Sequence, residues 1–180
     1  MSSVREKKIK EFLKELSSNS PTPGGGAVAA LVGSMAASLI EMVANLTVGK
    51  KGYEDVNEEM KKLGERARRL RKDLLTLSEK DIKAYDEVVR AYRASTNVQR
   101  ALKIATDVPL QTALLSNEVI QLAKEVIKKG NKKAVSDAKS ALFLAQAAKS
   151  SALENVKINL ISIKNPKLKE KINLVVARLR

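Results

Sequence analysis

Apolar residues recur at helical spacing along almost the whole chain. The most regular stretch is a four-three alternation of apolar positions that begins at Val56 and reaches Leu77. Such a repeat lines one seam of a helix that packs against neighbouring helices. The same count, carried forward, puts Asp81 at the next seam position and Ala84 after it. We therefore expect one helix of about 55 Å, at about 1.5 Å per residue, with a carboxylate in its apolar seam.

The other helices are predicted from the same periodicity and from the residues that interrupt it. No stretch alternates apolar and polar residues as a strand does, so the predicted fold class is all-α. Pro109 falls inside one expected helix, where it removes a backbone donor, so we expect a bend or a break there. The prediction is a single domain over residues 1–180, an up-and-down bundle of about five to six helices, one or two of them long. The other helices are expected over about 4–17, 26–47, 98–129, 134–164 and from 166 onward.

The composition removes several kinds of chemistry. The chain has no cysteine and no histidine, which excludes disulfides and thiolate chemistry and removes the usual metal ligands, so no metal site is expected. Proton transfer has to use Asp, Glu, Lys or Tyr. The formal net charge of +14 attracts anions such as nucleic acids, acidic membrane surfaces or small polyanionic molecules. Aromatic residues make up only 3%, which argues against a platform for stacking single-stranded bases.

The apolar run from Ala27 to Val48 is long enough to raise the question of a membrane span. Glu41 lies inside it, and small residues dominate it, so we interpret it as a buried helix of a soluble core. No targeting signal is recognisable, since the first fourteen residues are basic and amphipathic. We expect a cytoplasmic protein with no membrane partner.

Asp81 is the first candidate for chemistry. A carboxylate enclosed by an apolar seam loses hydration, which raises its pKa towards neutrality. A carboxyl group tuned in this way suits a general acid or base in a chain without histidine. The structural alternative is that the helix ends or shifts register near Ser78 and leaves Asp81 in water.

Four further segments carry candidate binding residues. A loop with two prolines ends in three consecutive glycines and opens a helix, where free N–H groups and the positive dipole end can hold a carboxylate or a phosphate. A tight turn with close backbone packing is its structural alternative. In the other three segments the candidates have structural alternatives as solvated charges, dipole partners or helix ends. The candidates of all four segments are Gly24, Gly25 and Gly26 in the loop, Lys50 and Lys51, Asp137, and the pair Asn155 and Asn159.

Taken together, these segments resemble the cyclodeaminase family. This family comprises the cyclodeaminase half of formimidoyltransferase-cyclodeaminase and the related stand-alone methenyltetrahydrofolate cyclohydrolases. The resemblance runs from about Phe12 to the last helix, and six ordered segments are a far more specific signal than one glycine-rich loop. The matching segments are Ser20-Pro21-Thr22-Pro23-Gly24-Gly25-Gly26, 44–53, Asp81-Ile82-Lys83-Ala84-Tyr85, Val108-Pro109-Leu110, Gly130-Asn131 with Ser136-Asp137, and 155–160.

The resemblance implies an all-helical homodimer that acts on a tetrahydrofolate derivative as its substrate, with no permanently bound cofactor. It implies conversion of 5-formiminotetrahydrofolate to 5,10-methenyltetrahydrofolate plus ammonia. The alternative at the same site is hydrolysis of 5,10-methenyltetrahydrofolate to 10-formyltetrahydrofolate. The family's catalytic aspartate falls on Asp81. The residues implied to line the folate site are Ser20, Pro23, Gly24, Gly25, Gly26, Lys50, Lys51, Asp137, Asn155 and Asn159.

Two interpretations of other kinds stay open at this point. A basic helical bundle without catalytic activity, binding nucleic acid or protein, would explain the charge but neither the glycine loop nor the seam aspartate, so we do not expect nucleic acid as the partner. The second interpretation is that the chain is a member of this family without catalytic activity. The connection from Ala94 to Val98 is shorter than in many relatives, and that difference bears on substrate affinity. Both a site within one subunit and a site between two are compatible with the sequence.

Overall fold

Helices alone form the fold of residues 4–179, which are the residues that this computed structural model describes. No strand occurs within this range, which confirms the predicted all-α class. The elements are α1 (Ile9–Leu16), α2 (Gly25–Asn45), the 3₁₀ turn η1 (Glu54–Val56), α3 (Asn57–Arg93), α4 (Val98–Lys129), the 3₁₀ turn η2 (Lys132–Ala134), α5 (Val135–Ile161) and α6 (Pro166–Leu179).

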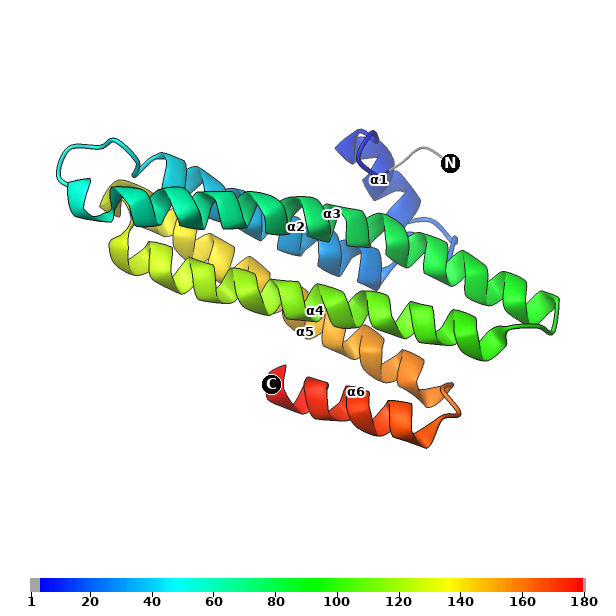
Figure 1. The fold of residues 1–180 in the computed structure, drawn as a ribbon. Helices are drawn as coiled ribbons and strands as arrows, with labels where there is room; N and C mark the ends of the chain where they lie inside the picture. The colour runs from blue at the N-terminus through cyan, green and yellow to red at the C-terminus, as the bar shows by residue number, and fades with distance from the viewer. Residues whose placement is uncertain (1–3, 180) are drawn as a thin grey trace.

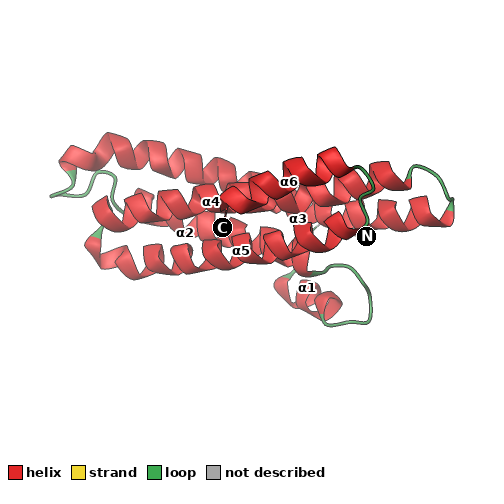
Figure 2. Ribbon diagram, turned by 90° about the horizontal axis from the view of Figure 1, so that it is seen from below, coloured by secondary structure: helices red, strands yellow, loops and turns green. Residues whose placement is uncertain are grey.

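The helices α2, α3, α4 and α5 run alternately up and down as a bundle (Figure 1). α2 packs against all three of the others. α1 and α6 lie outside the bundle (Figure 2), and α6 packs on α4. An ion pair between Arg5 and Glu79, 3.6 Å long, joins the segment before α1 to α3. The bundle therefore carries the core, and α1 and α6 are additions to its surface.

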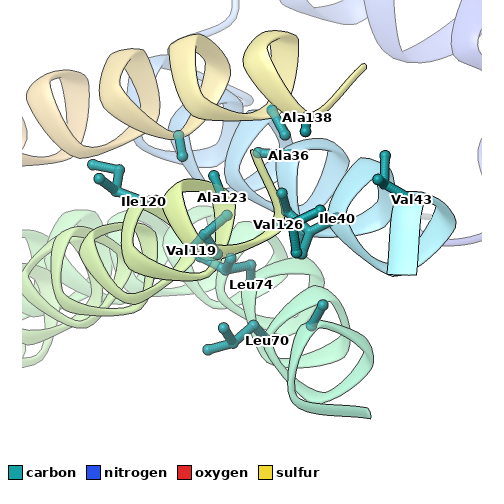
Figure 3. Packing of buried hydrophobic residues seen from close by; sticks show 14 of the residues in the cluster. Ala36, Ile40, Val43, Leu70, Leu74, Val119, Ile120, Ala123, Val126 and Ala138 are labelled. Atoms are coloured by element: carbon teal, nitrogen blue, oxygen red, sulfur yellow. The ribbon is translucent and has the colours of Figure 1, made fainter. Parts of the chain in front are cut away.

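The core lies between α2 and its three neighbours, and small residues on α2 make it possible. A Cβ atom at Gly33 would lie 3.0 Å from the Ser116 hydroxyl of α4 and 3.3 Å from the Leu74 side chain of α3. Glycine at this point allows both neighbouring helices to approach the backbone of α2 closely. Figure 3 shows the larger apolar side chains that fill the remaining space. They include Ile40, Val43, Leu70, Leu74, Val119 and Val126, each no more than 1% exposed.

α3 is one uninterrupted helix of 37 residues, as the seam predicts. Its buried apolar residues follow the predicted positions, among them Met60, Leu70, Leu77 and Ala84. The helix neither ends nor shifts at Ser78, which is itself buried. The structural alternative for Asp81, exposure beyond the end of the helix, is therefore wrong.

Two expectations about helix boundaries need correction. The first helix begins at Ile9 and not near residue 4, because Lys8 has an extended backbone (φ −65°, ψ 142°) and so forms the N-cap. The Glu11 carboxylate accepts a hydrogen bond from the Lys8 backbone N–H at 3.4 Å, as in a capping box. The second expectation is a bend or a break at Pro109, and the break is wrong, since α4 continues through it.

Asn159 explains how α4 passes through Pro109. A proline at this position has no N–H to donate to the carbonyl of Ala105, four residues earlier. The side-chain amide of Asn159 on α5 donates to that carbonyl instead, at 2.7 Å. The Ala105 carbonyl therefore keeps a hydrogen-bond partner, and the backbone bond lost at Pro109 leaves no acceptor unsatisfied.

α2 is long and apolar enough to span a membrane by length and composition, with a mean hydropathy of 1.9. In the folded chain it lies against α3, α4 and α5. Glu41, the charged residue in this helix, faces Arg68 and Arg71 of α3, with N–O distances of 2.8 and 2.9 Å. The apolar character of α2 is thus explained by its central place in the bundle.

Candidate active site

A cavity of about 320 Å³ lies where the start of α2 meets α3, α4 and the last part of α5. Its volume is at the small end of the range of about 300–1,000 Å³ for ligand sites. Its polar groups come from segments far apart in sequence, which the bundle brings together. The lining residues are Pro21, Thr22, Gly24, Gly25, Gly26, Asp81, Ala84, Tyr85, Val88, Leu102, Ala105, Asn155 and Asn159.

The Asp81 carboxylate lies directly against the first turn of α2. A Cβ atom at Gly26 would be 2.2 Å from one carboxylate oxygen and 2.6 Å from the carboxyl carbon. The backbone N–H of Ala27 donates a hydrogen bond to the same carboxylate. Glycine at position 26 is therefore required for close approach of the two helices, and the carboxylate lies at the positive end of the α2 dipole.

Burial raises the pKa of Asp81 to about 6, from an ordinary value of 3.8. The hydrogen bond from the Ala27 N–H acts in the opposite direction and lowers the pKa, but the loss of hydration is the larger effect. Within residues 4–179, no Lys or Arg forms an ion pair with Asp81 that would reverse it. A carboxyl group with this pKa changes protonation state easily near neutral pH, which is what a general acid/base needs.

The two asparagines are placed by α5. Both are half-buried and lie four residues apart, so they share one face of the helix. The Asn155 amide donates to the Ser151 carbonyl at 2.9 Å, and its nitrogen is 3.6 Å from where a Cβ of Gly25 would be. The Asn159 amide donates its hydrogen bond to the Ala105 carbonyl of α4. Asn155 therefore packs on the glycine loop, whereas Asn159 supports the wall made by α4.

The structure divides the predicted loop residues between the cavity and its surroundings. Gly24, Gly25 and Gly26 line the cavity, while Pro23 is buried and does not. The peptide bond between Thr22 and Pro23 is cis. Ser20 lies outside the cavity, in a neighbouring groove, and its hydroxyl donates to the Thr22 carbonyl at 2.8 Å.

Lys50, Lys51 and Asp137 are not brought to this cavity within one chain. The lysines follow the last turn of α2, whose 21 residues place the two ends of the helix about 30 Å apart. Asp137 lies in the first turn of α5, and Asn155 is about 27 Å further along the same helix. These three residues form a separate group at the opposite end of the bundle.

Tyr85 lines the cavity, although the sequence placed it only in a matching segment and not among the residues expected to line the site. It follows Asp81 by four residues in α3, so the two side chains share a helix face. That spacing is a signal in the sequence that could have identified it. Leu102 and Ala105 of α4 also line the cavity, but nothing in their local pattern separates them from ordinary core residues.

Fold and cavity together define the class of protein: an all-helical bundle with a site built around one enclosed carboxyl group. A family model described as formiminotransferase-cyclodeaminase matches residues 8–178. The chain therefore belongs to the formiminotransferase-cyclodeaminase family, which confirms the resemblance found in the sequence.

Individual relatives agree with this assignment. The methenyltetrahydrofolate cyclohydrolase of Methylorubrum extorquens is 43% identical in an alignment 162 positions long, which covers 84% of this chain and 78% of the relative. The crystal structure of formiminotetrahydrofolate cyclodeaminase from Thermotoga maritima is 36% identical, with a TM-score of 0.94 over 98% of this chain and 89% of that one. The formimidoyltransferase-cyclodeaminase of Rattus norvegicus is 27% identical over 94% of this chain, which spans only 33% of that relative.

Proposed function

We propose that this protein converts 5-formiminotetrahydrofolate to 5,10-methenyltetrahydrofolate and ammonia, with Asp81 as the acid/base. The observation that carries the proposal is the Asp81 carboxylate, held in a cavity against the first turn of α2 with its pKa raised to about 6. The solved structure with a TM-score of 0.94, a formiminotetrahydrofolate cyclodeaminase, supports this choice of reaction. No resident cofactor or metal takes part in the proposed steps.

Asp81 moves one proton in the proposed reaction. The formimino group enters in its protonated form, CH=NH₂⁺. N10 of the folate attacks its carbon, the C–N10 bond forms as the C=N bond becomes single and leaves an amino group, and the N10 proton passes to the Asp81 carboxylate. The resulting Asp81 carboxylic acid then gives the proton to the amino nitrogen, the C–N bond to that nitrogen breaks, and ammonia leaves. One group can act first as base and then as acid because its pKa lies near the working pH.

The rest of the cavity orients the two nitrogens. Holding N10 close to the formimino carbon removes much of the entropic barrier to ring closure. The glycine loop, Asn155 and the α4 wall supported by Asn159 form rigid surfaces around Asp81 for this purpose. The methenyl product is a cation, so the ionised carboxylate beside it also stabilises the developing charge, and its burial strengthens that effect.

A second candidate reaction is the hydrolysis of 5,10-methenyltetrahydrofolate to 10-formyltetrahydrofolate. The observation in its favour is the 43% identical relative that is named as a methenyltetrahydrofolate cyclohydrolase. Here Asp81 takes a proton from water as its oxygen attacks the methenyl carbon. The C–N5 bond then breaks, the second water proton passes to N5, and one proton is released overall.

Giving the purified protein each substrate separates the two reactions. Cyclodeaminase activity releases ammonia as methenyl absorbance rises, whereas cyclohydrolase activity removes methenyl absorbance without ammonia. We expect ammonia release by the wild type, and we expect Asp81→Asn to reduce its rate by about 10²–10⁴-fold. Full turnover by Asp81→Asn would refute the role of Asp81, and no turnover of either folate by the wild type would refute the function.

We also propose that the protein is a homodimer. Several large apolar side chains lie on its surface: Met35 and Met42 on α2 are 46 and 38% exposed, Leu46 directly after α2 is 50% exposed, and Phe143 on α5 is 66% exposed. A second copy covering this surface would remove it from water. Sedimentation velocity at micromolar concentration is expected to give a dimer, and substituting Met42 and Phe143 by Asp is expected to give monomers. A wild-type monomer at high concentration would contradict the proposal.

A further inference from the structure

The cavity around Asp81 is continued by a second hollow along α3. This groove has a volume of about 590 Å³ and shares Pro21, Thr22 and Tyr85 with the cavity, so the two adjoin. Its other lining residues are Ser20, Asp86, Val89, Arg90 and Arg93. A ligand bound at Asp81 and longer than the cavity would pass Tyr85 into this groove.

The residues of α3 along this path change character in steps of four. Asp81, Tyr85, Val89 and Arg93 follow one another at four-residue spacing, so they form a stripe that winds slowly around one side of the helix. At about 1.5 Å per residue, Tyr85 lies about 6 Å and Arg93 about 18 Å beyond Asp81 along the helix axis. The order from the cavity outward is a carboxylate, an aromatic ring, an apolar side chain and a guanidinium.

Arg90 and Arg93 are exposed and available to an anion. Neither forms an ion pair with a carboxylate within residues 4–179. The Arg90 guanidinium donates only a long hydrogen bond, 3.4 Å, to the backbone carbonyl of Asp86. The Asp86 carboxylate also lines the groove, so two cations face one anion there. The groove is therefore a cationic extension of the cavity.

We propose that this groove binds the anionic end of the substrate, with Arg93 and Arg90 on its carboxylates and Tyr85 against its benzoyl ring. This rests on the proposed function, because a tetrahydrofolate has the same order of parts: reacting nitrogens, then an aromatic ring, then a glutamate with two carboxylates. Guanidinium groups bind carboxylates with paired hydrogen bonds, which lysine cannot do. The anionic end is thereby assigned to α3 and not to Lys50 and Lys51, which lie at the other end of the bundle.

The competing explanation for both arginines is structural. They lie in the last turn of α3, where cations complement the helix dipole. A dipole role would change the thermal stability of the protein without making ligand binding depend on the glutamate. The test therefore compares two ligands that differ only in that group.

Tetrahydrofolate and the primary amide of tetrahydropteroate, which keeps the ring system and the benzoyl amide but has no carboxylate, are titrated against wild-type protein and variants by calorimetry at low salt. We expect the wild type to bind tetrahydrofolate more tightly. Arg93→Gln and Arg90→Gln are each expected to raise the Kd for tetrahydrofolate about fivefold, and the double variant more, with the Kd for the tetrahydropteroate amide unchanged within about twofold. Arg69→Gln makes the same charge change on an exposed side chain of α3 about 36 Å from Arg93, and is expected to leave both Kd values unchanged.

Four outcomes would overturn the proposal. Equal loss of affinity for both ligands in the arginine variants would show a structural role, and no loss for either would show that the groove is not used. Selective loss for tetrahydrofolate in a Lys50→Gln/Lys51→Gln variant, with the arginine variants unaffected, would move the anionic subsite to the other end of the bundle. Failure of wild type to bind either ligand would instead refute the proposed function itself, and the subsite with it.

Discussion

The two ends of the α2–α5 bundle carry similar residues and use them differently. Both have glycines beside a terminus of α2 and polar residues on α5. At the end where α2 begins, Gly26 and Asp81 are in contact and Asn155 packs on the loop, around a cavity. At the end where α2 finishes, the polar groups mainly form hydrogen bonds with one another, and these bonds fix the turns between helices.

The second end is a network of turn and loop hydrogen bonds. The Asn131 backbone N–H donates to the Thr47 hydroxyl at 2.9 Å, and its side chain donates to the Leu46 carbonyl at 3.1 Å. The Lys132 N–H donates to the Tyr53 hydroxyl at 2.9 Å. Gly49 and Gly52 have φ of 71° and 86°, which other residues rarely adopt. At the end where α2 finishes, the glycines and Asn131 are thus explained by backbone geometry and hydrogen bonding. At the end where α2 begins, the enclosed Asp81 carboxylate is available for catalysis.

The largest expected effect is at Asp81. Asp81→Asn keeps the size and shape of the side chain but cannot accept the N10 proton. We expect turnover to fall by about 10²–10⁴-fold, the usual contribution of a general acid/base. Steady-state kinetics test this, with circular dichroism to confirm that the variant is folded. A smaller loss than about tenfold would mean that Asp81 only lines the site.

Two neighbouring glycines provide a matched pair for the contact between α2 and α3. The added Cβ of Gly26→Ala would lie 2.2 Å from the Asp81 carboxylate, whereas that of Gly25→Ala would make an ordinary contact of 3.6 Å with Asn155. Since displacing a catalytic group by about 1 Å can cost about 10²-fold, we expect such a loss for Gly26→Ala and less than about fivefold for Gly25→Ala. Equal losses in kcat would contradict the special role of position 26.

The raised pKa of Asp81 predicts how stability depends on pH. The pKa of this carboxyl group is about 6 when folded and 3.8 ordinarily, so the folded state binds a proton more tightly than the unfolded state. This contribution to stability is present at low pH and is lost as pH rises through about 6. Relative to Asp81→Asn, wild type is expected to lose on the order of 2 kcal/mol of unfolding free energy between about pH 4 and pH 7.

Urea denaturation of both proteins across that pH range is the measurement. Parallel stability curves for wild type and Asp81→Asn would show that Asp81 is hydrated in the folded protein. The rate of turnover supplies an independent check, since the base form of Asp81 increases with pH, and kcat/KM is expected to rise up to about pH 6 and then level off.

Asn159 and Pro109 predict a coupling between α5 and α4. Asn159→Ala removes the partner of the Ala105 carbonyl in the wild type, but in a Pro109→Ala background the new backbone N–H can take its place. We expect Asn159→Ala to cost about 1–2 kcal/mol in the wild type and about 1 kcal/mol less in the Pro109→Ala background. A double-mutant cycle by urea denaturation measures this, and full additivity would contradict it.

The smallest effect on turnover is expected at the other end of the bundle. Lys50→Gln/Lys51→Gln and Asp137→Asn alter residues about 30 Å from the Asp81 cavity of their own chain. We expect kcat within about twofold of wild type, because none of these residues touches the reacting atoms in that chain. A large fall in kcat would mean that a partner subunit brings this end to the site, and mixing Asp137→Asn with Asp81→Asn would then restore activity.

Local patterns allowed the prediction of the helices and of the place of Asp81 in the α3 seam. The alternation from Val56 to Leu77 is a property of one helix, so counting along it reached Asp81 without knowledge of any other helix. The same method could not decide between a bend and a break of α4 at Pro109, because the compensating donor, Asn159, lies 54 residues from the carbonyl that it satisfies.

The sequence by itself determined the helical class, the length of α3 and the presence of a carboxyl group in its seam, since helical periodicity depends only on spacing along the chain. The tertiary structure alone decided that Gly26 meets Asp81, that Asn159 supports α4, and that Lys50, Lys51 and Asp137 lie away from that cavity. The physical reason is that a cavity forms where separate helices fail to touch, and their relative directions and separations are set by packing between distant segments.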